Sequence, residues 1–156
     1  MSFTPGDPGF EARVRASFSR QSIMTTLGAT LTRIEPGMIE IALPFAEHIL
    51  QQHGFVHAGV VATIADSAAG YAGLTLMPPG AGVLTAEFKI NLLAPAQGDR
   101  LVAQGRVIKS GRSLTIAEAD VFAETDGLTE KGPTRKHAAR LTATLMSMRD
   151  RQGVAD

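Results

Sequence analysis

One stretch of the sequence decides the fold: His57-Ala-Gly-Val-Val-Ala-Thr-Ile-Ala-Asp66-Ser-Ala-Ala-Gly-Tyr-Ala-Gly-Leu-Thr-Leu-Met77. Its small and apolar residues predict one long helix, which Pro78-Pro79-Gly80 ends. A helix that is apolar nearly all round needs cover on every side. A curved antiparallel sheet wrapped around it would supply most of that cover, so the remaining sequence is expected to form strands.

Alternation of apolar and polar residues on both sides of this helix predicts those strands. Before it, Leu31 to Glu35 and Met38 to Pro44 flank a Pro36-Gly37 turn, as in a β-hairpin. After it come four alternating segments, over 83–93, 101–109, 113–123 and 138–148, the last preceded by a polar loop over 124–136. A hairpin, one long helix and a run of antiparallel strands predict an α+β protein of the hotdog architecture, in which the sheet wraps the helix.

The chain is expected to form one domain with short extensions. Its 156 residues and 44% hydrophobic content are enough for one core but not for two. Phe10 to Phe18 has apolar residues at helical spacing, and Ser22 to Leu27 predicts a further helical turn. We therefore expect an N-terminal helical extension over 1–27, the sheet-and-helix domain over 28–148 and a frayed tail over 149–156.

Charge and cysteine content argue against several classes of function. The formal net charge is zero, so no overall field attracts nucleic acid or an anionic membrane. There is no cysteine, which removes disulfides and thiolate chemistry, and the first residues lack the features of a signal peptide, so a cytoplasmic protein is expected. The run over 54–77 is poor in Leu and Ile and has Asp66 near its centre, so it is not expected to span a membrane.

Asp66 is the candidate reactive group. It is the only formal charge between Glu47 and Glu87, in a segment that is otherwise typical of buried sequence. Such a carboxylate must be neutralised, paired or used in chemistry. It could merely cap a neighbouring loop or pair with a buried arginine, but its isolation in an uncharged run favours a functional role.

Three motifs follow one another along the chain: Gln51-x5-His57-Ala-Gly-Val-Val-Ala-Thr-Ile-Ala-Asp66, Thr85-Ala-Glu-Phe-Lys-Ile-Asn91-Leu-Leu-Ala-Pro95 and Lys109-Ser-Gly-Arg112. Together they resemble the hotdog-fold acyl-CoA thioesterases of the phenylacetate-pathway type and the 4-hydroxybenzoyl-CoA thioesterase group, over roughly 39–146. The resemblance implies hydrolysis of an aryl or short-to-medium-chain acyl-CoA to the free acid and CoA. No metal and no other cofactor is expected.

Thioester hydrolysis explains why these residue types occur together. The reaction needs an activated water or a carboxylate nucleophile on one side of the carbonyl and hydrogen-bond donors facing the developing oxyanion on the other. Asp66 would supply the first, as general base or as nucleophile. Free N–H groups at the helix start, near Ala58 and Gly59, would supply the second. The family usually has His-Gly-Gly here, so the Ala58 methyl narrows the approach of the thioester oxygen unless the backbone shifts.

The resemblance implies supporting roles for further residues of the catalytic site. Gln51 matches the upstream amide of the family, with Gln52 as an adjacent competitor. Thr85 would orient water near the acid. His57 would hydrogen-bond the helix start or position Gln51.

Substrate-binding candidates complete the predicted site. Lys109 and Arg112 would clamp the phosphates of CoA, because a chain without net charge needs local cations to hold so anionic a ligand. Ala58, Phe88 and Asn91 are further binding candidates, although Asn91 also fits a role in satisfying backbone groups. The acyl pocket is expected to draw on Phe55, Tyr71, Leu74 and Phe88.

The length of the helix constrains the assembly. Asp66 lies seven residues beyond Gly59, or about 10 Å along the axis at 1.5 Å per residue. One carbonyl cannot contact both on the same helix. If two copies pair about a two-fold axis with antiparallel helices, each Asp66 faces the helix start of its partner. The sequence therefore predicts a homodimer with two shared sites, and the resemblance extends this to a dimer of dimers.

Other chemistries find less support. His48, His53 and His57 fall within ten residues, but no cysteine joins them and their spacing matches no common metal-ligand pattern. Phosphate-binding glycine loops, a Gly-x-Ser-x-Gly elbow and an HExxH pair are absent. Two alternatives remain open: a hotdog hydratase or dehydratase acting on enoyl thioesters, and a non-catalytic acyl-CoA-binding protein, which the lack of a basic DNA-binding segment disfavours.

Overall fold

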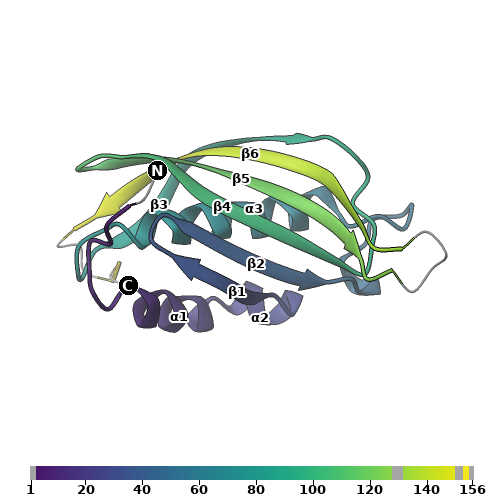
Figure 1. Cartoon of the computed structure of the whole chain (residues 1–156), viewed down its shortest axis with the longest axis horizontal. Helices are drawn as coiled ribbons and strands as arrows, with labels where there is room; N and C mark the ends of the chain where they lie inside the picture. Colours follow the sequence, from purple (N-terminus) through teal and green to yellow (C-terminus); the bar gives the residue numbers. More distant parts are fainter. Residues whose placement is uncertain (1–2, 128–131, 150–152, 155–156) are drawn as a thin grey trace.

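The computed structural model describes residues 3–127, 132–149 and 153–154. A curved sheet of six antiparallel strands, in the order β1-β2-β4-β5-β6-β3, wraps the long helix α3 (Figure 1). In chain order the elements are α1 Phe10–Arg20, α2 Ser22–Leu27, β1 Thr30–Glu35, β2 Met38–Pro44, a 3-10 turn Glu47–Ile49, α3 Ala58–Leu74, β3 Gly82–Leu92, β4 Arg100–Ser110, β5 Leu114–Thr125 and β6 Thr134–Met148. This is the predicted hotdog fold.

Most element boundaries lie close to those expected, and one does not. The predicted polar loop over 124–136 is too long, because β5 runs to Thr125 and β6 begins at Thr134. Arg135 pairs in the ladder with Glu124 although both are charged. Only one face of an antiparallel sheet has to be buried, so charged residues can continue a strand on the other face. Most of the tail expected over 149–156 lies outside the described residues.

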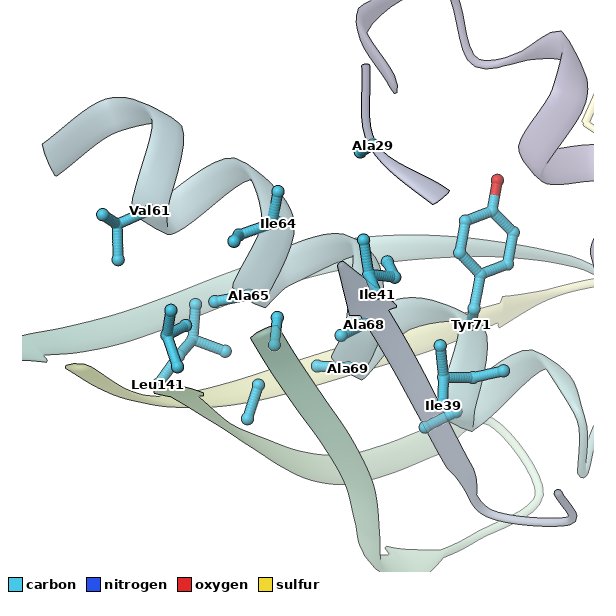
Figure 2. Packing of buried hydrophobic residues seen from close by; sticks show 14 of the residues in the cluster. Ala29, Ile39, Ile41, Val61, Ile64, Ala65, Ala68, Ala69, Tyr71 and Leu141 are labelled. Atoms are coloured by element: carbon cyan, nitrogen blue, oxygen red, sulfur yellow. The ribbon is translucent and has the colours of Figure 1, made fainter. Parts of the chain in front are cut away.

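Small residues let α3 approach the sheet closely. Ala65, Ala68, Ala69 and Leu141 are fully buried between helix and sheet (Figure 2). The two backbones come very close at Gly105 of β4, where an added Cβ would lie 2.2 Å from the carbonyl carbon and oxygen of Ala68. Only a glycine leaves room for a helix backbone at this distance. The alanine-rich character of α3 is therefore a packing requirement.

The N-terminal helix α1 is fixed to the end of α3 by Arg13. Its guanidinium donates to the carbonyl oxygens of Leu74 at 2.7 Å, Pro78 at 2.9 Å and Met77 at 3.1 Å, and it pairs with Asp7 at 3.2 Å. The last carbonyls of a helix lack partners within it and carry partial negative charge, so a cation is stabilising there. Arg13 thereby holds the helical extension against the core helix.

We predict opposite effects of an added methyl group at two glycines. Gly105→Ala should lower the free energy of unfolding by about 1–3 kcal/mol, because the Cβ overlaps the α3 backbone. Gly70→Ala in α3 should be neutral or raise it by up to about 1 kcal/mol, because its Cβ meets no atom within 4 Å and alanine favours the helix. Urea unfolding of both variants tests this. Equal effects would contradict the packing described here.

Candidate active site

Asp66 and Thr85 meet across the gap between α3 and the edge strand β3. The Thr85 hydroxyl donates to Asp66 Oδ1 at 2.8 Å. A β-bulge follows Thr85 directly: Thr85 pairs with Leu145 and Glu87 with Thr144, so Ala86 is an extra residue in the ladder. Bulges re-aim side chains and are frequent beside active sites. Because of the bulge, the regular alternation of side chains between the two faces of β3 is interrupted directly after Thr85.

The Asp66 carboxylate is half-buried and is not neutralised by a cation. Among the described residues none forms an ion pair with it, and Thr85 is its one hydrogen-bond donor. Burial raises the pKa of Asp66 above its ordinary value, and the hydrogen bond from Thr85 offsets part of that rise. The alternative that Asp66 pairs with a buried arginine is therefore excluded for the described part of the chain.

A pocket of about 410 Å³ opens beside Asp66. Its walls come from the N-terminal helices, from α3 and from the start of β3. The lining residues are Ser17, Arg20, Gln21, Asp66, Ser67, Gly70, Tyr71, Val83, Leu84 and Thr85. Of the residues expected to shape an acyl pocket, Tyr71 lies here.

The residue that precedes α3 caps the start of the helix. His57 is the N-cap residue, and its Nδ1 accepts a hydrogen bond from the Gly59 N–H at 2.9 Å. His57 thus bonds the helix start, as expected, and the Gly59 N–H is already engaged. Ala58 is an exposed residue, and its N–H has no partner among the described hydrogen bonds. Of the N–H groups of Ala58 and Gly59, that of Ala58 is therefore the one without a partner in the described part of the chain.

A second pocket, of about 400 Å³, opens at this helix start. Gln51 and Ala58 line it together with mainly apolar residues: Phe55, Val56, Val61, Leu92, Leu93, Ala94, Pro95, Ala96 and Ala138. The Gln51 side chain accepts a hydrogen bond from the His53 N–H of its own loop, and Gln52 is exposed. Within one chain the predicted catalytic residues thus fall into two groups: Asp66 and Thr85 in one pocket, Gln51 and Ala58 in the other.

Five predicted binding residues lie outside both pockets. Phe88 and Asn91 are exposed on β3, and Lys109 and Arg112 are exposed where β4 turns into β5. Leu74 is fully buried in the core, so it does not shape an acyl pocket. One chain alone does not bring these residues to Asp66.

Sequence reasoning missed the wall formed by Ser17, Gln21 and Ser67. Ser17 lies three residues after Val14, on the same face of α1, and it is buried. A polar residue on an apolar helix face was the available signal. Ser67 follows Asp66 in an alanine-rich run, and its hydroxyl donates to Gln21 Oε1 at 3.3 Å.

Comparison with known proteins agrees with the fold. The family model described as "Thioesterase superfamily" matches residues 53–130, half of the chain. The chain belongs to the thioesterase superfamily. It is 46% identical to a solved thioesterase family protein of Silicibacter pomeroyi, with a TM-score of 0.84, over 90% of this chain and 98% of that one. This confirms the predicted family and a thioester hydrolase.

The present chain has lower sequence identity to its curated relatives. It is 27% identical over 106 residues to the 1,4-dihydroxy-2-naphthoyl-CoA hydrolase of Listeria monocytogenes, covering 68% of this chain and 86% of that protein. It is 28% identical over 110 residues to the mouse acyl-coenzyme A thioesterase 13, covering 69% and 78%.

Two further observations concern metals and membranes. Within residues 3–127, 132–149 and 153–154, no group of three or more His, Asp or Glu side chains is placed to hold a metal ion. In the same residues no helix is long and apolar enough to cross a membrane.

The raised pKa of Asp66 predicts that Asp66→Asn stabilises the thioesterase at neutral pH. The pKa in the folded state lies above that in the unfolded chain, so wild-type stability falls as pH rises from the unfolded value through the folded one. Asparagine carries no charge. At pH values above the folded-state pKa of Asp66, the melting temperature of the variant should therefore exceed that of wild type. At pH values below the unfolded-state pKa, the two melting temperatures should match. Asp126→Asn, which removes an exposed carboxylate in a surface ion pair with Arg100, is the control, because such a pair contributes little to stability. An Asp66→Asn variant less stable than wild type at neutral pH would contradict the role of burial.

Proposed function

We propose that the protein hydrolyses acyl-CoA thioesters to the free acid and CoA, with Asp66 as general base or nucleophile. The observation that carries this is the half-buried carboxylate, held by Thr85 and open to a pocket, in a chain of this superfamily. Aryl or short-to-medium acyl groups fit a pocket of about 410 Å³.

The hydrogen bond from Thr85 gives the two oxygens of the Asp66 carboxylate different roles. It occupies Oδ1 and leaves Oδ2 to take a proton from water or to attack the carbonyl carbon. In the first route water adds to the carbonyl and its proton passes to Asp66. The C–S bond then breaks, and the CoA sulfur takes the proton from Asp66, so that CoA leaves as the thiol and the carboxylate is ionised again. The raised pKa favours this proton transfer, because a base is most effective when its pKa is near the working pH.

The oxyanion donors would come from the helix start of a second copy. Ala58 lies eight residues before Asp66 on α3, about 12 Å along the axis, and the two residues line different pockets. We infer a homodimer in which the Asp66 pocket of one subunit meets the Ala58 pocket of the other. The freer Ala58 N–H would then bind the developing oxyanion.

The edge strand β3 supports this pairing. It is 11 residues long and, in the described sheet, hydrogen-bonds only with β6. Phe88, Leu92 and Leu93 are about half exposed on and beside it, at 46%, 55% and 54%. A long apolar edge is a template for pairing with another strand. Joining β3 to its copy would cover these side chains and unite the two pockets, with Lys109 and Arg112 proposed as surface contacts for CoA phosphates.

We predict that Asp66→Asn abolishes thioesterase activity while the fold is kept. Thiol release from a panel of aryl and aliphatic acyl-CoA esters, followed with a thiol-reactive dye, should fall by about 100-fold or more. The protein has no cysteine, so it gives no background. Asp126→Asn should match wild type. A folded Asp66→Asn variant with full activity would reject Asp66 as the reactive group.

Ala58→Pro isolates the contribution of one backbone donor. Ala58 is the first residue of α3, where proline fits a helix, and His57 already has φ −59° and ψ 137°, as a residue before proline requires. The substitution should lower kcat by about 10²–10³ through loss of the N–H, with the circular dichroism spectrum unchanged. Ala58→Gly, which keeps the N–H, should remain active. Full activity of the proline variant would exclude Ala58 as the oxyanion donor.

Thr85→Val should move the pH profile of kcat/KM. The Thr85 hydroxyl lowers the pKa of Asp66, so its removal should raise that pKa further. Activity requires the ionised carboxylate, and the acidic limb of the profile should therefore shift to higher pH. Thr85→Ser retains a donor and should restore the wild-type limb. An unshifted limb in Thr85→Val would show that Asp66 does not set it.

A further inference from the structure

Gly70 has an unusual environment for a residue in the interior of a helix. It is buried within α3. Apart from its two chain neighbours and the backbone of its own helix, however, no atom of the described residues would lie within 4 Å of an added Cβ. Buried positions are normally filled, because protein interiors are close-packed. Gly70 lines the pocket of about 410 Å³ beside Asp66, so the space in front of it belongs to that pocket.

Packing does not explain why this position is a glycine. An added Cβ at Gly73 would lie 2.6 Å from Leu145 Cδ1, and one at Gly105 would lie 2.2 Å from the Ala68 backbone. Gly70 has no such neighbour in the described part of the chain. Alanine is the better helix former, and α3 uses alanine for most of its small residues. A glycine that weakens the helix without relieving a close contact indicates that the empty space itself is used.

Gly70 lies on the same face of α3 as Asp66. Four residues separate the two, which is one helical turn, or about 6 Å along the axis. Both residues line the same pocket. An acyl group whose thioester carbonyl is held at Asp66, and which extends along α3 away from the helix start, therefore crosses Gly70. An acetyl or propionyl group ends before this position, whereas a longer acyl group has to pass it.

Contacts between α3 and the N-terminal helices form one wall of this pocket. The Tyr71 ring points from α3 toward the N-terminal helices (Figure 2), and its centroid lies 5.8 Å from that of the Phe18 ring. The Tyr71 and Ser17 hydroxyls lie 3.3 Å apart, and the Ser67 hydroxyl donates to Gln21 Oε1 at 3.3 Å. Since these groups bond one another, they give the pocket a fixed width. A pocket of fixed width suits the free end of a substrate, whereas the CoA arm has to lead out to solvent.

We propose that the pocket beside Asp66 binds the acyl group and that Gly70 determines the length of acyl group that it accepts. The missing side chain leaves the space through which an acyl group longer than propionyl extends along α3. The preferred substrates are then acyl-CoA esters whose acyl group passes Gly70, such as hexanoyl- and octanoyl-CoA. This inference rests on the proposed thioesterase function and adds the class of substrate to it.

Two variants of different size at Gly70 test the proposal. The kcat/KM for thiol release is measured with acetyl-, propionyl-, hexanoyl- and octanoyl-CoA. Wild type should favour the better of the two longer esters over propionyl-CoA by about tenfold or more. Gly70→Ala should reduce this ratio by about threefold and Gly70→Leu by about 30-fold, because the added side chain fills the path of the longer groups. Ala12→Leu, which is exposed on α1 and outside both described pockets, should leave the ratio unchanged.

The melting temperature distinguishes a filled pocket from a damaged fold. The methyl group of Gly70→Ala meets no close neighbour among the described residues, so the melting temperature should equal that of wild type or exceed it while the preference for longer esters falls. A ratio that neither variant changes overturns the role of Gly70. A wild type without a preference for the longer esters does the same.

The outcomes also separate this inference from the proposed function. An equal loss for all esters in both Gly70 variants overturns the acyl subsite, because the pocket would then hold the CoA arm. That result leaves Asp66-dependent thioester hydrolysis standing. No Asp66-dependent hydrolysis of any ester contradicts both the inference and the proposed function.

Discussion

The close contact between the backbones of α3 and β4 at Gly105 is the constraint on which the rest of the structure depends. It requires small residues along α3 and allows the sheet to curve around the helix. The sheet buries most of α3, and Asp66 remains only half-buried, at the margin where Thr85 of the edge strand reaches it. The tight core and the single open carboxylate are therefore two results of the same packing. A larger helix residue at the contact would lift α3 and separate Asp66 from Thr85.

The two ends of α3 have different hydrogen-bonding environments. Its first residues lie at an apolar pocket and keep a free donor at Ala58, while the carbonyls of its last residue, Leu74, and of Met77 just beyond it accept hydrogen bonds from the Arg13 guanidinium. The same contact holds α1 so that Ser17 forms a wall beside Asp66. The N-terminal extension thus contributes both to stability and to the pocket beside Asp66. Its position depends on the charge-assisted hydrogen bonds of Arg13 and on the burial of Val14, Met24 and Leu27 in the common core.

The sequence predicted the fold well because its strongest signals are local. The alanine-rich run ended by two prolines allowed one long helix, and alternating residues marked each strand. It misplaced the start of β6, since Arg135 is typical of a loop until its partner strand is known. The expectation of a site at Asp66 rested on a lone charge and on the family resemblance. Ser17 and Gln21 were missed because their contacts are with residues of α3 far away in the sequence, whereas the bond from the helix start to His57 is local and was expected.

In the proposed homodimer each active site combines Asp66 of one subunit with Ala58 of the other. Asp66→Asn and Ala58→Pro variants, each inactive alone, can be unfolded together and refolded as a mixture. In a mixed dimer one site carries both defects and the other carries neither, so acyl-CoA hydrolysis should recover to about a quarter of the wild-type rate in an equal mixture. No recovery, with mixed dimers shown to be present by mass spectrometry, would contradict a shared site.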